Sequence, residues 1–252
     1  MMAVSAGIAA MGLTPFASSF AMFASGRAFE QVRNSIGYPQ LNVKIGATHG
    51  GISVGEDGAS HQCCEDYALM RSIPGMVVMS PADDVETRAM VKAAYEHEGP
   101  VYMRFGRAPV PVIHDEETFH FEIGKGEVLA DGTDVAVIAN GLLAAEALEA
   151  GKLLAQEGIS VRVINMATVK PLDTELVLKA ARECGKIVTA EEHSIIGGLG
   201  EAVCSAVAES GVLCLIKRVG VNDEFGHSGP FKALLKEFGL SAEHIAEVVR
   251  AL

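Results

Sequence analysis

The stretch 48-THGGISVGEDGASHQ-62 joins a short apolar run, Val43 to Ala47, to a segment with helical character that begins near Glu65. Glycine lets the backbone adopt positive φ and approach a ligand closely, at an entropic cost that a plain connection does not need. Long polar connections between a strand and a helix are where α/β proteins place their sites. A solvated loop that only caps the next helix is the alternative, but histidines, carboxylates and glycines in combination favour a polar catalytic loop.

The composition limits the classes of function. With 252 residues, 49% of them hydrophobic and 21% charged, the chain is long enough for two domain cores. A net charge of -12 excludes general electrostatic attraction to nucleic acid or to an anionic membrane, so any phosphate must be bound by individually placed Arg and His. No apolar run reaches the roughly 20 residues of a spanning helix, and the start lacks the basic residues of a secretory signal, so we expect a cytoplasmic protein.

The cysteines and the scattered histidines do not indicate a metal site. The five cysteines contain no C-x-x-C pair, and Cys63 and Cys64 are adjacent, which favours free thiols in a reducing compartment over disulfides or zinc. Five histidines lie outside any ligand spacing and are expected on the surface or in packing positions: His97, His114, His120, His227 and His244. We therefore expect no metal ligands in this chain.

Apolar runs and helical patterns alternate along the whole sequence. Strands are expected at 14–19, 42–47, 76–79, 101–104, 135–139, 161–165, 186–190 and 213–219. Helices are expected at 25–35, 65–71, 83–96, 144–157, 173–184 and 199–209, and near residues 231 and 242. This alternation predicts an α/β fold of two domains whose mainly parallel sheets carry helices on both faces. Prolines and an acidic run place a linker at 109–122, between domains at 1–108 and 123–252.

The central loop also carries a resemblance to a known family. Thr48-His49, followed by Gly55-Glu-Asp-Gly-Ala-Ser-His-Gln62, resembles the Thr-His…Gly-Glu-Asp-Gly-(Pro/Ala)-(Thr/Ser)-His-Gln signature of the transketolases, enzymes that depend on thiamine diphosphate. The similarity extends through the rest of the chain and is strongest to the C-terminal polypeptide of split transketolases. It implies a doubly wound pyrimidine-binding domain at 1–108, incomplete at its N-terminus, and a smaller α/β C-terminal domain at 123–252.

The resemblance implies a reaction and a set of partners. A two-carbon ketol unit would pass from a ketose phosphate to an aldose phosphate on thiamine diphosphate, as in the pentose phosphate pathway, with the donor and acceptor sugars left open. Nothing in the sequence resembles the Gly-Asp-Gly…Asn motif that binds metal and diphosphate. The diphosphate and its Mg²⁺ would therefore belong to a separate N-terminal transketolase subunit, and the two chains would form an α2β2 assembly.

Aromatic residues near the start of the chain are the candidates for binding the cofactor. In the family, aromatics at the positions of Phe20 and Phe23 hold the aminopyrimidine ring, and flat heterocycles need such walls to exclude water. The third family aromatic aligns with Gly26, so that wall is either missing or supplied by Phe29. Arg27 is a candidate for a phosphate or a structural contact. Simple packing of aromatic side chains at helical spacing is the alternative.

Residues of the central loop and of the strand end at 104 are the candidates for substrate contacts. The resemblance assigns His61 to hydrogen bonding or proton transfer at the reacting oxygens and Asp57 to selection of the C2 hydroxyl configuration. It places His49 and Arg107 at the phosphate of the substrate, where a guanidinium binds bidentately. A surface salt bridge is the alternative for Arg107, and Arg104 is a weaker candidate for the same phosphate.

Three further features bear on activity. In the family the helix at 1–12 follows a Gly-Ile-Ala-Glu-Gln-Asn segment whose Glu activates the cofactor, and no such segment occurs here, so we expect a shortened chain that is inactive as it stands. A non-catalytic partner subunit is therefore an alternative. A deoxyxylulose-phosphate synthase is another, although that family usually has Arg where His49 stands. The glycines of 191-EEHSIIGGLG-200 could cradle an anion, but a structural or inter-subunit role is favoured.

Overall fold

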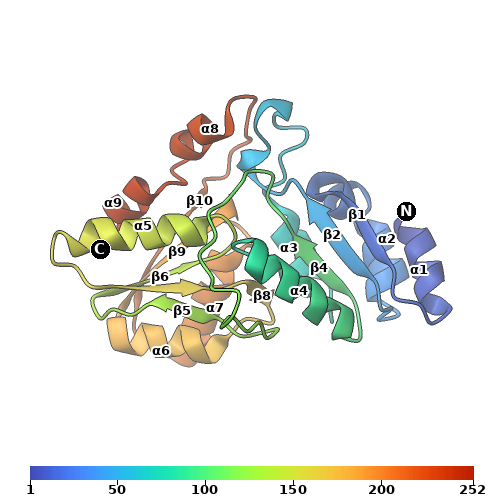
Figure 1. Ribbon diagram of the computed structural model, residues 1–252, viewed down its shortest axis with the longest axis horizontal. Helices are drawn as coiled ribbons and strands as arrows, with labels where there is room; N and C mark the ends of the chain where they lie inside the picture. Colours follow the sequence, from blue (N-terminus) through green and yellow to red (C-terminus); the bar gives the residue numbers. More distant parts are fainter.

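Short apolar runs separated by glycine, proline and charged residues form two five-stranded sheets that lie side by side (Figure 1). The computed structural model describes residues 1–252. In the first sheet the strand order is β1-β2-β4-β3-β8, and the first four of these strands run parallel. The bounds are Phe16–Phe20 for β1, Lys44–Thr48 for β2, Val77–Met79 for β3, Val101–Arg104 for β4 and Thr168–Lys170 for β8.

Helices cover both faces of the first sheet. Alternate residues of β3 and β4 pack under α4 (Asp84–Glu96), as the two-residue period of a strand requires. This cluster comprises Val77, Met79, Met90, Ala94, Val101, Met103 and Ala167. The opposite face is covered by α1 (Met2–Ala10), by α3 (Asp66–Arg71) and by the helical segment between β1 and β2.

The segment between β1 and β2 is more irregular than the predicted helix at 25–35. It consists of a π-helical turn η1 (Met22–Arg27), the short helix α2 (Phe29–Gln31) and a second π-helical turn η2 (Val32–Gly37). π-Helical turns widen the backbone locally and frequently occur at functional sites. Here η1 directly follows β1 and shifts Phe23 toward the end of the sheet where the central loop lies.

The second sheet has the strand order β10-β9-β6-β7-β5 and is parallel except for β5. The strand bounds are Glu127–Ala130 for β5, Val135–Ala139 for β6, Val161–Asn165 for β7, Lys186–Ser194 for β9 and Leu215–Val221 for β10. The helix bounds are Leu143–Ala155 for α5, Thr174–Cys184 for α6, Leu199–Ser210 for α7, Phe231–Glu237 for α8 and Ala242–Arg250 for α9. Helices α5 and α9 pack together on one face, and α6 and α7 lie on the other.

The two halves of the chain share a hydrophobic core, and the second half contributes one strand to the first sheet. A cluster of 30 buried residues includes Ile45 of the first sheet together with Ile138 and Ile187 of the second. Strand β8 leaves the second half and pairs antiparallel with β3, so it forms the edge of the first sheet. The halves are therefore joined by backbone hydrogen bonds as well as by packing.

The α/β class and the mainly parallel sheets predicted from the sequence are confirmed. The strands expected at 101–104, 135–139 and 161–165 have those bounds in the structure. Strands β5 and β8 were not predicted, and β9 continues four residues beyond the expected end at residue 190. No helix is both long enough and apolar enough to span a membrane.

Candidate functional site

The central loop leaves β2 at its carboxyl end and is held in a defined shape. Gly51 pairs with Cys63 in an isolated antiparallel bridge, which closes the loop at its base. Between these residues the chain forms 3₁₀ turns, η3 (Ile52–Asp57), with a kink at Gly55. Gly51, Gly55 and Gly58 have φ of 85°, 81° and 73°, a region that favours glycine. The glycines of this stretch are therefore required by its backbone path.

Two histidines of the loop and two phenylalanines after β1 form an aromatic group. His49 stacks on Phe20 with ring centroids 3.8 Å apart and an interplanar angle of 10°. His61 meets Phe23 edge-on at 5.4 Å and Phe20 edge-on at 6.0 Å. Parallel pairing of β1 with β2 brings these four side chains together, because Phe20 pairs with Thr48 at the carboxyl ends of the two strands. The structure thus brings together four of the five aromatic and imidazole candidates named from the sequence.

His49 is held in an unusual backbone conformation with an electrically neutral ring. Its φ is 60°, and its Nδ1 lies 2.9 Å from the hydroxyl of Thr48. Burial and the nearby charge of Arg107 lower the pKa of His49 below its ordinary value, whereas the carboxylate of Asp57 opposes this shift. The imidazole is therefore uncharged at neutral pH and can either donate or accept a hydrogen bond.

Arg107 follows β4 and reaches back to the central loop. Its Nη1 donates to the carbonyl oxygen of Val54 over 3.0 Å and lies 3.4 Å from the carboxylate of Glu56. The Arg107 side chain is 42% exposed, so part of the guanidinium remains open to a ligand. Asp57 lies exposed on the same turn. The structure therefore places one cation and one free carboxylate beside the aromatic group.

A cavity of about 650 Å³ lies at the junction of the two halves and is bordered by Phe23 of the aromatic group. Its wall includes Met22 and Phe23 from η1, the polar residues Ser60 and Gln62 from the loop, and Arg27. The guanidinium of Arg27 lies 5.3 Å from the centre of the Phe23 ring. The cavity thus combines an aromatic wall with a polar edge, which is typical of sites for flat heterocycles.

Phe29 does not lie with the other two phenylalanines. It belongs to α2, where it packs against the main hydrophobic core. It makes no ring contact with the aromatic group, and it does not line the cavity. Its assignment to the cofactor wall is therefore unsupported by the geometry, because the π-helical turn η1 separates it from Phe23. Of the three phenylalanines, only Phe23 borders the cavity.

The second half of the chain holds the central loop from outside, which the sequence did not reveal. Gln62 donates its side-chain amide to the carbonyl oxygen of Ile52 over 3.2 Å and to that of His227 over 3.0 Å. The hydroxyl of Ser228 donates to the carbonyl oxygen of Glu56 over 2.6 Å. Figure 1 shows the resulting contact, with α8 beside the cyan loop. Residues more than 160 positions apart leave no local sequence signal for such contacts.

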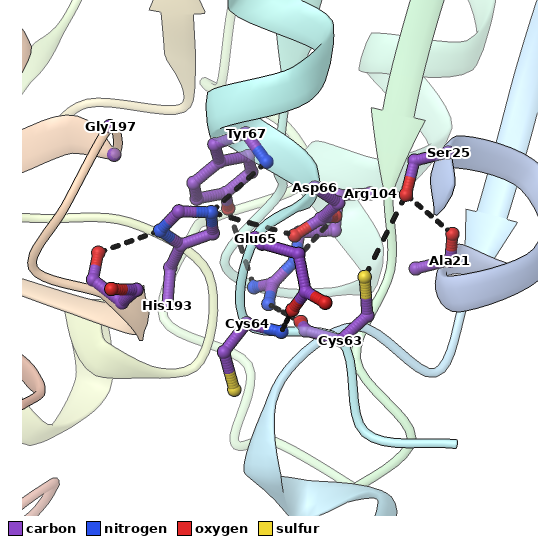
Figure 2. Close-up of polar contacts among 12 residues, drawn as sticks. Ala21, Ser25, Cys63, Cys64, Glu65, Asp66, Tyr67, Arg104, His193 and Gly197 are labelled. Atoms are coloured by element: carbon purple, nitrogen blue, oxygen red, sulfur yellow. Dashed lines mark hydrogen bonds and ion pairs between the residues drawn. The ribbon is translucent and has the colours of Figure 1, made fainter. Parts of the chain in front are cut away.

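Arg104 is a structural residue and not a phosphate ligand. Its side chain is 3% exposed, and its Nε lies 3.0 Å from a carboxylate oxygen of Asp66 (Figure 2). Its Nη2 donates to the carbonyl oxygens of Cys63 and Glu192 over 3.3 Å and 2.6 Å, and its Nη1 donates to the hydroxyl of Tyr67 over 3.5 Å. The guanidinium also lies 4.7 Å from the centre of the Tyr67 ring. The weaker assignment of Arg104 to substrate phosphate is corrected, because no donor group is open to a ligand.

His193 belongs to the same buried cluster and is also structural. Its Nε2 accepts the backbone N–H of Tyr67 over 3.1 Å, and its Nδ1 donates to the carbonyl oxygen of Ser194 over 2.7 Å (Figure 2). Burial lowers the pKa of His193 to about 4, and this ring is neutral. His193 therefore joins β9 of the second half to α3 of the first without contacting the cavity.

The glycine-rich stretch after β9 does not form an anion site. The carboxylate of Glu191 accepts the N–H groups of Leu199 and Gly200 over 2.6 Å and 2.7 Å. These are the first donors of α7, so the helix start is capped by a side chain of the same chain. The structural interpretation of this stretch is therefore supported.

All five cysteines are free, and no group of three or more metal-ligating side chains is present.

Comparison with known proteins assigns both halves of the chain to domain families. Residues 1–112 match the transketolase pyrimidine-binding domain, and residues 124–245 match the transketolase C-terminal domain. A protein from Methanocaldococcus jannaschii named as a transketolase C-terminal section is 51% identical over 98% of this chain and 78% of its own. A 6-deoxy-6-sulfo-D-fructose transketolase subunit from Clostridium sp. (strain MSTE9) is 45% identical over 100% of this chain and 76% of its own.

Two further comparisons define the extent of the similarity. The 1-deoxy-D-xylulose-5-phosphate synthase of Heliobacterium modesticaldum is 40% identical over 99% of this chain, which spans only 38% of that enzyme. A solved structure of a split gene transketolase, described as an inactive β4 tetramer, has 52% identity and a TM-score of 0.93 over 99% of this chain and 80% of its own. With both domains matched and relatives at this identity, the chain belongs to the transketolase family, in which it corresponds to the polypeptide that carries the pyrimidine-binding and C-terminal domains.

Proposed function

We propose that this chain is the C-terminal subunit of a transketolase that transfers a two-carbon ketol unit from a ketose phosphate to an aldose phosphate. In this proposal a separate N-terminal subunit binds the diphosphate of thiamine diphosphate and a divalent metal such as Mg²⁺. The names of the relatives support the split, since two of them are a C-terminal section and a split gene product. An α2β2 assembly with the partner subunit would complete the enzyme.

One observation carries the proposal: a continuous series of contacts leads from the 650 Å³ cavity, which Phe23 lines, through Phe20 to His49, which lies near the charge of Arg107. Phe23 lines the cavity, the His61 ring contacts both phenylalanines, and the His49 ring stacks on Phe20. A ligand that extends past His49 toward Arg107 would pass from an apolar wall to a cation. This order matches a reaction in which a heterocycle binds at one end and a phosphorylated sugar at the other.

The residues of the cavity fit the pyrimidine part of thiamine diphosphate and not its diphosphate. The apolar wall of Met22 and Phe23 suits a flat ring, and the amide of Gln62 and the hydroxyl of Ser60 offer polar partners at its edge. The lining has one cation, Arg27, and three acidic residues, Glu65, Asp223 and Glu224. Carboxylates repel a diphosphate, so that group requires cations from another polypeptide.

Thiamine diphosphate supplies the electron sink for breaking and forming the carbon–carbon bond. The side chains of this polypeptide position the sugar substrate and exchange protons with it. His61 binds the hydroxyl of Ser60 through Nδ1 at 3.0 Å, which leaves Nε2 free to exchange a proton with a sugar oxygen. Asp57 accepts a hydroxyl and so selects the sugar configuration. Arg107 binds the substrate phosphate, and the neutral His49 donates a hydrogen bond beside it.

The test is ketol transfer from xylulose 5-phosphate to ribose 5-phosphate by the chain mixed with an N-terminal transketolase subunit, thiamine diphosphate and Mg²⁺. The 252-residue chain and a form that carries a Gly-Ile-Ala-Glu-Gln-Asn-like segment before Met1 are assayed in parallel. We expect transfer by the extended form, and none when the partner or the coenzyme is omitted.

Two results would contradict the proposal. An extended chain that assembles with its partner and transfers no ketol unit would make it a non-catalytic subunit. Condensation of pyruvate with glyceraldehyde phosphate, in place of ketol transfer, would make it a deoxyxylulose-phosphate synthase. Sedimentation of the mixture at a mass other than that of two copies of each subunit would refute the α2β2 stoichiometry alone.

A further inference from the structure

A buried carboxylate from the second half of the chain contacts the backbone of the central loop. Glu192 lies in β9 and is 3% exposed. Its Oε1 accepts the backbone N–H of Ser53, the second residue of η3. Ser53 is itself fully buried, so no water can replace Glu192 as the acceptor. The loop that carries His49, Asp57 and His61 is therefore attached to β9 by a charged hydrogen bond.

The loop backbone is shaped to receive this carboxylate. Gly51 has φ of 85°, and a Cβ added there would lie 2.4 Å from both Cδ and Oε1 of Glu192. Any side chain at this position would therefore displace the carboxylate or the loop. The backbone carbonyl of Glu192 is also fixed, because Arg104 donates to it over 2.6 Å. Both the donor segment and the acceptor are thus held in place before any ligand binds.

The attachment point lies one residue from the group that holds Arg107. The carbonyl oxygen of Val54 accepts from Nη1 of Arg107 over 3.0 Å, and Val54 directly follows Ser53. Val54 is fully buried, so its carbonyl cannot shift without moving the turn around it. A displacement of the Ser53 amide would therefore move the acceptor that orients the Arg107 guanidinium.

We propose that Glu192 is a positioning residue for the sugar-phosphate site, which it controls by fixing η3 and, through the Val54 carbonyl, the guanidinium of Arg107. The inference rests on the proposed function, since it assigns the substrate phosphate to Arg107. It gives the C-terminal domain a direct role in substrate preference: the domain holds the phosphate-binding end of the loop in its productive position.

The neighbouring residue Glu191 provides a matched control. It has the same side chain, lies on the same strand and is also fully buried. Its carboxylate caps α7 by accepting from Leu199 and Gly200 and does not contact the central loop. Removal of either carboxylate leaves buried N–H groups without an acceptor and destabilises the fold. Only removal of the Glu192 carboxylate should alter the site.

The experiment compares Glu192→Met with Glu191→Met in the assembled, ketol-transferring complex. For each variant, kcat and KM are measured with ribose 5-phosphate and with unphosphorylated ribose as acceptors. We expect Glu192→Met to reduce the preference for the phosphorylated acceptor about tenfold, mainly through a higher KM, the loss typical of one hydrogen bond to a charged group. Glu191→Met should leave this preference unchanged, and Glu192→Gln, which retains an acceptor oxygen, should restore most of it.

A second variant and a second measurement keep the inference testable if Glu192→Met does not fold. Gly51→Ala places a methyl group against Glu192 from the loop side and should reduce the phosphate preference in the same direction. Hydrogen exchange of the Ser53 amide, measured by mass spectrometry on the chain without substrate, should be faster in Glu192→Met and Gly51→Ala than in Glu191→Met.

Two outcomes overturn the inference: equal phosphate preference in the Glu192 and Glu191 variants, or unchanged exchange at Ser53 in Glu192→Met. The proposed function fails separately, if the unsubstituted complex transfers no ketol unit. In that case the exchange measurement still decides whether Glu192 fixes the loop.

Discussion

Replacement of Arg104 by methionine tests the structural role of the buried cluster. The Arg104 guanidinium forms an ion pair with Asp66 at 3.0 Å and donates to two carbonyl oxygens, and the two side chains are 3% and 0% exposed. Without it, the Asp66 carboxylate keeps one side-chain donor, the hydroxyl of Tyr102 at 2.9 Å. Removal of one partner of a buried ion pair leaves an uncompensated charge and costs about 3 to 5 kcal/mol. We therefore expect Arg104→Met to lower the free energy of unfolding by this amount.

The assay is urea unfolding followed by far-ultraviolet circular dichroism, because the chain has no tryptophan and only four tyrosines. The midpoint should fall without a change in the slope of free energy against urea, as expected for a loss of stability alone. The matched control is Arg88→Met. Arg88 pairs with Asp84 at 3.2 Å on the surface, where both side chains are more than half exposed, and it should change stability by less than about 1 kcal/mol.

The double variant sharpens the test. Asp66→Asn alone removes the charge that Arg104 neutralises, and the loss in Arg104→Met with Asp66→Asn should be smaller than the sum of the two single losses. A loss below about 1 kcal/mol for Arg104→Met, similar to that of the surface control, would refute the reasoning. A loss in the double variant equal to the sum of the two single losses would show that the two residues act independently.

Three further predictions concern pH, the cofactor and the substrate. Burial opposes the charge on His114, but the carboxylates of Glu127 and Asp83 raise its pKa to about 9. The protonated ring should therefore stabilise the chain fully below pH 6.5, and up to about 3 kcal/mol of this stabilisation should be lost as pH rises through 9. Urea unfolding at a series of pH values measures this fall in the free energy of unfolding, and the fall should be smaller in His114→Gln. Phe23→Ala should raise the half-saturating concentration of thiamine diphosphate about tenfold in steady-state assays, whereas an equal rise in Phe29→Ala would contradict the assignment of the cavity wall. Arg107→Ala should raise KM for ribose 5-phosphate about tenfold or more and leave KM for ribose unchanged; an equal rise for both sugars would remove Arg107 from the phosphate site.

The sequence predicted the parts of the fold that depend on local pattern. Strand β6 is a continuous run of apolar residues and β7 is rich in β-branched ones, and the bounds of both were predicted without error. Strand β8 was missed because Thr168–Lys170 is only three residues long and pairs with β3, about 90 positions earlier. The irregular segment after β1 was missed because its π-helical turns, with i→i+5 hydrogen bonds, are short insertions in a helical stretch that a search for a 3.6-residue period does not detect.

The candidate site divides in the same way. His49 and His61 stood out because the loop sequence is rich in functional groups, and parallel pairing of β1 with β2 brings them to the phenylalanines. Glu192 gave no such signal, because its partner Ser53 lies 139 positions earlier and both residues are ordinary in isolation. Phe29 was one of two alternatives for the family aromatic that aligns with Gly26, the other being a missing wall, and its position in α2 outside the cavity lining favours the second.

The edge strand β8 has a consequence for how this polypeptide can be divided. Cleavage of the peptide bond anywhere in the segment 109–122 should leave two fragments interlocked, because the later fragment still contributes a strand to the sheet of the earlier one. An isolated fragment 1–112 would instead expose the unpaired edge of β3 to other molecules, and exposed strand edges promote aggregation. The family boundaries therefore mark units of sequence similarity, and we expect residues 1–112 not to fold independently without β8.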